Sequence, residues 1–214
     1  MKSFSLVAVV GCLFAIQTNA ASISVADFNS PTGGGGFSSI GTGGTFGSGN
    51  GWTVTSGSVD VIGTGFWQSP DGNQNVDLDG SSVGAIATAI TIPYGGDVTI
   101  GFWLAGNPAG APTIKHLEVD LGAASQTFTF DTTGKSWPAS QNNMGWLYES
   151  AVFSNQSAGA TTLTFASLDS SYGGTFYGPV VGTVTASIPD GGMTAVLLGV
   201  GIVGLGCARR KLTA

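Results

Sequence analysis

The chain has 214 residues, of which 42% are hydrophobic and only 8% are charged, and it contains 36 glycines. All twelve carboxylates but only two lysines lie between Asp27 and Asp190, and this formal charge of −10 argues against nucleic acid or an anionic membrane surface as a partner of the body of the protein. The two cysteines, Cys12 and Cys207, lie in apolar segments near the two ends, so the body has neither a disulfide nor a thiol nucleophile.

Residues 1–20 have the pattern of a secretory signal peptide. Lys2 precedes an apolar segment at 4–16, and small residues lead to an expected cleavage after Ala20. A lipoprotein box ending at Cys12 is the alternative, but cleavage there would leave an apolar run on the mature side. We therefore predict an N-terminal signal helix and an exported body.

Residues 21–187 are long enough for one domain with a hydrophobic core. A first strand at 23–28 and then a flexible glycine-rich loop are expected within residues 21–50. Ten short apolar segments follow, separated by Gly, Asn, Asp and Pro clusters and by no helical pattern, which predicts an all-β sandwich or barrel. The ten strands are expected at 52–55, 59–62, 76–79, 86–92, 98–104, 114–121, 126–131, 146–153, 161–168 and 180–186.

No catalytic residue is predicted. The segment from Gly80 to Gly84 fits the pattern G-x-S-x-G, but a nucleophile elbow needs a helix after the serine, and residues 83–92 are β-like. The only histidine, His116, alternates with Leu117 on its strand, so we expect a surface residue rather than a base.

Carboxylates and amides cluster between residues 71 and 79. Asp77 and Asp79 are two apart on an expected strand, so they share one face, as glycoside hydrolysis requires of an acid and its partner. Asp79-Gly80 is also an ordinary hairpin end, and the sequence offers no second acidic cluster as a proton donor, so the hairpin end is the preferred interpretation. Asp71, Asn73, Asn75 and Asp77 have the alternate spacing of a calcium loop, but the turn glycine and the bidentate glutamate are missing. A turn held by Asn and Asp side chains is the preferred interpretation, and no metal site is predicted.

Large aromatic residues are numerous for a small sandwich, with five tryptophans and four tyrosines in the chain. Those that lie beside polar loop residues are candidates to stack on sugar rings, while Asn and Asp bind hydroxyl groups. Two interpretations stay open: a non-catalytic glycan or exopolysaccharide-matrix binding module, and a purely structural cell-surface or biofilm-matrix protein. A polysaccharide-active hydrolase is the weaker third. Full burial of Trp67 and Trp137 would favour the structural role. The glycan-binding candidates are Trp67, Asp71, Asn73, Trp137 and Asn142.

The last 27 residues, 188–214, have three parts. Residues 193–208 form an uncharged apolar run, which as a helix spans about 24 Å against a hydrocarbon core of about 30 Å. We expect a transmembrane helix here, with the basic residues after it on the cytoplasmic side and the body outside. The motif before the run is Ile188, Pro189, Asp190, Gly191 and Gly192, and the basic residues are Arg209, Arg210 and Lys211.

This arrangement resembles the C-terminal sorting signals of the PEP-CTERM type, in the variant with a Val-Pro-Asp-Ser-Gly motif, with Ile188 in place of Val and Gly191 in place of Ser. The resemblance implies an exosortase-type processing enzyme, transient anchoring in the inner membrane, and final placement on the cell surface or in the matrix of a Gram-negative bacterium. The pair Gly191 and Gly192 leaves open a Gly-Gly route that uses a rhomboid-like protease.

A second resemblance covers residues 51–184. It rests on segments such as Trp67-Gln-Ser-Pro-Asp-Gly, Leu104-Ala-Gly-Asn-Pro and Tyr177-Gly-Pro, which are similar to the choice-of-anchor C family of extracellular bacterial domains. It implies a jelly-roll, galactose-binding-like sandwich without a catalytic cofactor. Such domains usually close with Asp-Asn-Val, where this chain has residues 182–184, Gly-Thr-Val; with Asp27 alone remaining, a structural calcium site that links the termini is doubtful.

Overall fold

The computed structural model describes residues 20–32, 34–135, 143–170, 174 and 176–189. All ten strands expected after residue 51 are present, and most extend further than predicted because backbone pairing continues beyond the apolar run. The elements are β1 (Ala21–Ile23), β2 (Phe37–Gly41), β3 (Thr45–Phe46), the 3-10 turn η1 (Ser48–Asn50), β4 (Trp52–Ser56), β5 (Ser58–Ile62), β6 (Asn75–Asp77), β7 (Ala85–Ile92), β8 (Gly96–Gly106), β9 (Ile114–Leu121), β10 (Ala124–Asp131), β11 (Leu147–Gln156), β12 (Gly159–Ser167) and β13 (Pro179–Ile188).

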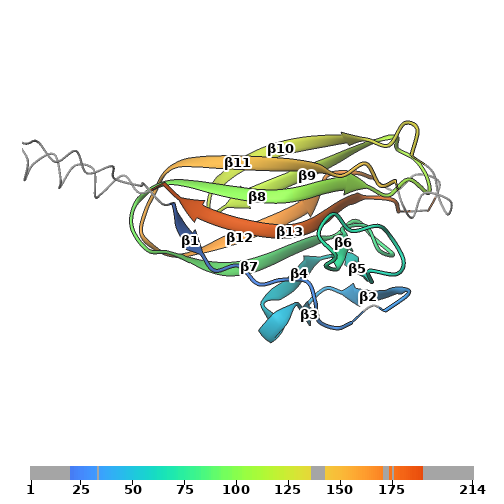
Figure 1. Ribbon diagram of the computed structural model, residues 1–214, viewed down its shortest axis with the longest axis horizontal. Coiled ribbons are helices and arrows are strands. Elements are labelled where there is room, and N and C mark those ends of the chain that lie inside the picture. Colours follow the sequence, from blue (N-terminus) through green and yellow to red (C-terminus); the bar gives the residue numbers. More distant parts are fainter. Residues whose placement is uncertain (1–19, 33, 136–142, 171–173, 175, 190–214) are drawn as a thin grey trace, which may run out of the picture.

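The strands form two antiparallel sheets. The first has the order β11-β8-β13-β6-β5-β2, and β1 pairs with the last residues of β13. The second has the order β10-β9-β12-β7-β4-β3. In Figure 1 the short strands β2 to β6 gather on one side of the molecule, while β10 and β11 lie on the opposite side. The predicted all-β class is confirmed, and the architecture is an antiparallel sandwich.

The hydrophobic core lies between the two sheets. The apolar residues of β8 at 98, 100, 102 and 104 alternate with Thr99, Gly101 and Trp103 as expected, and these four are fully buried. Phe102 meets Phe165 of β12 edge-on, with ring centroids 5.3 Å apart. Each large apolar side chain that is fully buried contributes about 1.5–3 kcal/mol, so this interdigitated core is the main source of stability.

The prediction was wrong for residues 21–50. The first strand covers Ala21–Ile23 rather than 23–28, and two further strands, β2 and β3, form in the expected flexible loop. The glycine-rich segment has no apolar period of its own, but β5 offers β2 an edge with which Phe37 to Gly41 pair residue by residue. Phe46 of β3 is 1% exposed and contacts Phe28, whose side chain belongs to the core although it lies outside a strand. Tertiary pairing therefore overrides weak local propensity here.

The expected signal peptide at 1–20 and the C-terminal segment at 188–214 lie largely outside the described residues. Within the part of the chain that the structure describes, no helix is long and apolar enough to cross a membrane. The signal helix and the transmembrane helix at 193–208 therefore stay predictions. Ile188, counted above with the sorting motif, is the last residue of β13 and is fully buried, so the folded body extends one residue beyond 187.

Candidate functional site

One pocket, with a volume of about 260 Å³, lies beside strands β2, β5 and β6, and we call it the acidic pocket. Its wall combines carboxylates, an amide and aromatic rings. The lining comes from these strands, from the segments after β5, β6 and β8, and from the residues before β13. The lining residues are Phe37, Asp60, Ile62, Phe66, Trp67, Asp77, Asp79, Gly80, Asn107, Ala109, Phe176 and Tyr177.

Strand register brings two of the carboxylates together. Asp60 of β5 lies directly opposite Asp77 of β6, so the two side chains point to the same face of the first sheet. The next pair along, Val61 and Val76, is fully buried and points to the core, which places the carboxylates on the other face. Like charges directly opposite one another destabilise a sheet, so this pair contributes nothing favourable to the fold when both members are ionised.

Asp77 is held firmly although it is almost completely buried. Its Oδ1 accepts a hydrogen bond from the Asp79 backbone N–H at 3.0 Å, and its Oδ2 accepts one from Asn107 Nδ2 at 2.7 Å. Burial raises the pKa of Asp77 to about 8, and the nearby carboxylates Asp79 and Asp60 add to the shift against these two hydrogen bonds. Burial also raises the pKa of Asp60, while a hydrogen bond from Ser39 Oγ opposes this shift.

Asp79 differs because one of its oxygens has no partner. The residue is 2% exposed, and among the described residues no group donates a hydrogen bond to its Oδ1. Burial raises the pKa of Asp79 to about 6, the charge of Asp169 raises it further, and Lys115 lowers it. A buried acceptor without a donor costs about 1–3 kcal/mol, so the site is poorly satisfied as it stands.

Aromatic rings form another part of the wall. Phe37 and Phe66 meet edge-on at 5.5 Å between centroids, and Phe66 contacts Trp67 at 5.6 Å. Phe37 is 52% exposed, so its ring is open to a ligand, whereas Trp67 is 4% exposed. The Nε1 of Trp67 has no hydrogen-bond partner among the described residues, which leaves a buried donor at the same pocket as the free oxygen of Asp79.

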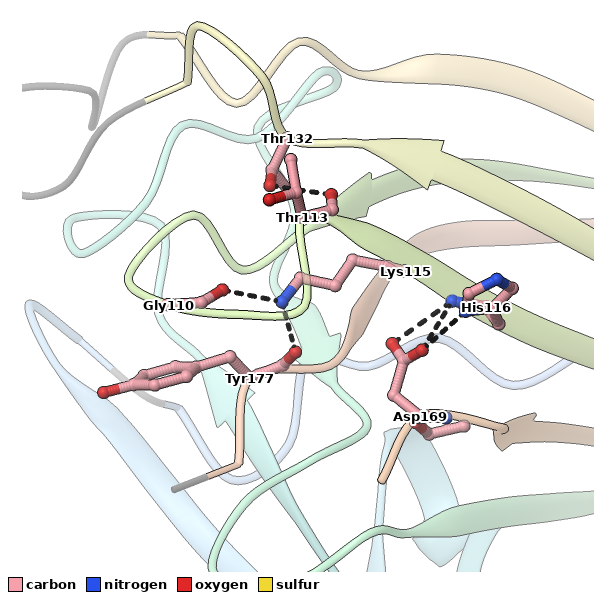
Figure 2. Close-up of polar contacts among 8 residues, drawn as sticks. Gly110, Thr113, Lys115, His116, Thr132, Asp169 and Tyr177 are labelled. Atoms are coloured by element: carbon pink, nitrogen blue, oxygen red, sulfur yellow. Dashed lines mark hydrogen bonds and ion pairs between the residues drawn. The ribbon is translucent and has the colours of Figure 1, made fainter. Parts of the chain in front are cut away.

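A buried lysine holds two of the segments that line the pocket. Lys115 of β9 is fully buried, and Figure 2 shows its Nζ donating to the carbonyl oxygens of Gly110, at 3.0 Å, and of Tyr177. Burial lowers the pKa of Lys115, whereas the charges of Asp169, Asp77 and Asp79 act in the opposite direction. The segment after β8 and the segment before β13 are therefore tied together by one ammonium group.

Sequence reasoning missed Lys115, although a signal was present. The residue has the same phase as Leu117 and Val119 on a strand whose apolar face was recognised, so alternation alone places it inward. His116 has the opposite phase and is exposed, as predicted, and Figure 2 shows it on the far side of β9 from Gly110, with its Nδ1 2.8 Å from Asp169 Oδ1. It does not line the acidic pocket.

The predicted glycan-binding residues are not brought together in the way that was expected. Trp67 was predicted to be an exposed ring, and this is wrong, because the segment after β5 folds it beside Phe66. Its burial counts in favour of the structural interpretation. Asp71 and Asn73 lie outside the pocket in a turn where Asp71 Oδ1 accepts from the Asn73 backbone N–H at 3.1 Å. Trp137 and Asn142 lie outside the described residues.

The calcium-like turn, Asp27 and the serines of the G-x-S-x-G segment all have structural roles. The turn at 71–73 is the Asx-type turn that was preferred over a calcium loop, and no group of three His, Cys, Asp or Glu in the described ranges is arranged to hold a metal ion. Asp27 Oδ1 accepts hydrogen bonds from the backbone N–H groups of Asn29 and Ser48. The serines of the G-x-S-x-G segment bond to Ser58, and strand β7 follows them rather than a helix.

The fold defines the class of this protein as a two-sheet antiparallel β-sandwich. A family model described as "Protein of unknown function (DUF642)" matches residues 23–187, and the chain belongs to this family. No curated protein matches the chain.

Solved structures of carbohydrate-binding modules are similar to the chain. A family 35 module from Clostridium thermocellum has 14% identity and a TM-score of 0.45, over 78% of this chain and 98% of that one. The C-terminal CBM6 of the laminarinase LamC from Zobellia galactanivorans has 17% identity and a TM-score of 0.40, over 55% and 82%. The module CBM6cm-2 from Cellvibrio mixtus lichenase 5A, in complex with cellotriose, has 19% identity and a TM-score of 0.38, over 56% and 82%.

Proposed function

We propose that the protein is an exported, non-catalytic carbohydrate-binding module whose glycan ligand occupies the acidic pocket. The observation that carries this proposal is that one pocket is lined by an open ring, Phe37, and by Asp79 and Trp67, whose buried Oδ1 and Nε1 have no hydrogen-bond partner among the described residues. A sugar unit offers C–H faces to the ring and hydroxyl groups that both donate and accept.

A binding role fits this pocket better than hydrolysis. Asp77 and Asp79 do lie at one pocket, as their spacing predicted, but both oxygens of Asp77 already accept hydrogen bonds from the protein. A glycoside hydrolase needs two carboxyl groups free to reach the scissile bond or a water molecule, and the remaining carboxylate Asp60 also accepts a hydrogen bond, from Ser39.

Replacement of Phe37 by alanine is the direct test of the pocket. Loss of an open ring that stacks on a sugar should weaken binding about tenfold, which corresponds to about 1.4 kcal/mol. A glycan array with the full chain identifies the glycan, and calorimetry then measures the affinity of both proteins for it. Leu168→Ala is the matched control, because Leu168 is 49% exposed and lines no part of the pocket. Equal binding by both variants, or no binding of any glycan by the native chain, contradicts the proposal.

The cellular part of the proposal rests on the two ends of the chain. The choice-of-anchor C and PEP-CTERM resemblances support export to the surface or matrix of a Gram-negative bacterium through an exosortase-type enzyme. In the described part of the chain, Ile188 is buried in β13 while Pro189 is exposed, so the first residue of the motif after the buried body is accessible to a protease.

Replacement of both Pro189 and Asp190 by alanine is expected to block processing and to leave uncut protein in the inner membrane. Proline keeps the backbone at this point free of helix, and alanine would allow the apolar helix to extend outward. The size and membrane fraction of the variant in its native host measure this. Normal maturation of the double alanine variant would show that the tail is only an anchor. Replacement of residues 209–211 by neutral residues should instead weaken retention in the membrane and the orientation of the helix.

A further inference from the structure

The acidic pocket brings three carboxyl groups together. Asp60, Asp77 and Asp79 line it, and the nearby cation is Lys115, which also interacts with Asp169. The register of β5 and β6 holds Asp60 and Asp77 opposite each other, an arrangement that costs stability whenever both are ionised. Burial raises the pKa of all three carboxyl groups, and a cation bound beside them would favour their ionised forms.

Such a cation has the character of an organic ammonium group rather than a metal ion. No set of three metal-ligating residues in the described segments has the geometry for a metal. The free oxygen of Asp79 needs an N–H or O–H donor, and Trp67 Nε1 needs an acceptor. Aromatic faces attract ammonium groups, and here Phe37, Phe66 and Tyr177 line the same pocket as the carboxylates.

Size restricts the ligand further. A volume of about 260 Å³ lies just below the range of about 300–1,000 Å³ that is typical of sites for drug-sized ligands, so the pocket takes one sugar unit rather than a long stretch of a chain. A single pyranose unit that carries both hydroxyl groups and an ammonium group meets each of these requirements.

We propose that the acidic pocket binds an amino sugar with a free, unacetylated amine, whose ammonium group is held by the carboxylates while Phe37 covers the sugar ring. This inference rests on the proposed function, since it names the chemical class of the glycan. Acetylation would remove the positive charge and add bulk at the same position, so the pocket should discriminate strongly between the two forms of one sugar.

The experiment compares three β-1,4-linked tetrasaccharides with the full chain at pH 7 and physiological salt by calorimetry: one of glucosamine, one of N-acetylglucosamine and one of glucose. The glucosamine tetramer is expected to bind at least tenfold more tightly than the other two. Preference for a neutral tetramer that is lost in Phe37→Ala overturns the amino-sugar inference and leaves the proposed function in place. If none of the three binds, and no other glycan does, both fail.

A matched pair of variants separates the pocket from the general negative charge of the body. Asp79→Asn and Asp131→Asn each remove one carboxylate, but the Asp131 side chain is exposed and accepts hydrogen bonds from Thr133. Asp79→Asn should reduce the preference for glucosamine about tenfold, and Asp131→Asn should leave it unchanged because exposed charges are screened by salt. Asp60→Asn provides a second variant at the pocket if Asp79→Asn does not fold. Equal effects of the pocket and surface variants would mean that the amine is attracted only by net charge, and the inference would fall.

Discussion

Replacement of Lys115 by methionine is expected to lower the free energy of unfolding by about 4 kcal/mol. The variant keeps the length of the side chain but removes the donor for the carbonyl oxygens of Gly110 and Tyr177, each of which then lacks a buried partner. It also leaves Asp77, Asp79 and Asp169 without the cation that offsets their charges. Removal of one partner from a buried charged network costs about 3–5 kcal/mol.

Lys135→Met is the control for this variant. Lys135 is only partly buried, and the same substitution there should change stability by no more than about 0.5 kcal/mol. Urea denaturation of both variants at pH 7 gives the comparison. Similar losses in the two variants would show that Lys115 acts only through its aliphatic stem, and that the segments around the pocket are held by other contacts.

The strands that could be predicted are those whose apolar period is visible in the sequence. β9 was located to the residue and β8 to within two residues at each end, because their inward apolar residues recur at every second position. β2 could not be predicted, because its sequence Phe-Ser-Ser-Ile-Gly has no strong preference and becomes a strand only through the edge of β5. Local signals therefore report strands that bury a face, and they miss strands that exist through pairing.

The acidic pocket could not be predicted from the sequence for a related reason. Asp60 and Asp77 become neighbours through the register of β5 and β6, and no local pattern encodes which residue of one strand faces which residue of the other. Asp77 and Asp79 were recognised as a pair because their spacing is local. Trp67 was placed in solvent because polar residues follow it, but neighbours in sequence do not determine burial, and Phe66 and the segment after β5 cover its ring.

The free energy of unfolding is expected to fall as pH rises from 5 to 8, by about 5 kcal/mol. Asp77 and Asp79 have pKa values of about 8 and about 6 in the folded protein, against 3.8 for an ordinary aspartate. At a pH between 3.8 and the folded pKa of a group, the folded state binds more protons than the unfolded state. Each rise of one pH unit in that interval therefore lowers the free energy of unfolding by about 1.4 kcal/mol per group. The stability that these carboxyl groups contribute is thus fully present below pH 4 and lost by pH 8. Urea denaturation at intervals of half a pH unit measures the slope.

Asp77→Asn should remove most of this slope, because the amide at position 77 does not titrate. The variant loses one of the two hydrogen bonds that Asp77 accepts, which costs about 1–3 kcal/mol at every pH, so the slope rather than the absolute stability is the readout. Asp131→Asn is the control: hydrogen bonds from the Thr133 hydroxyl and backbone N–H hold the pKa of Asp131 below its usual value, so that group titrates below this interval. If the slope persists in Asp77→Asn, the proton taken up on folding lies elsewhere, and Asp77 is ionised in the folded protein at neutral pH. A slope that disappears only in Asp77→Asn identifies the acidic pocket as the place where folding holds the proton, and a bound cation there should then displace it.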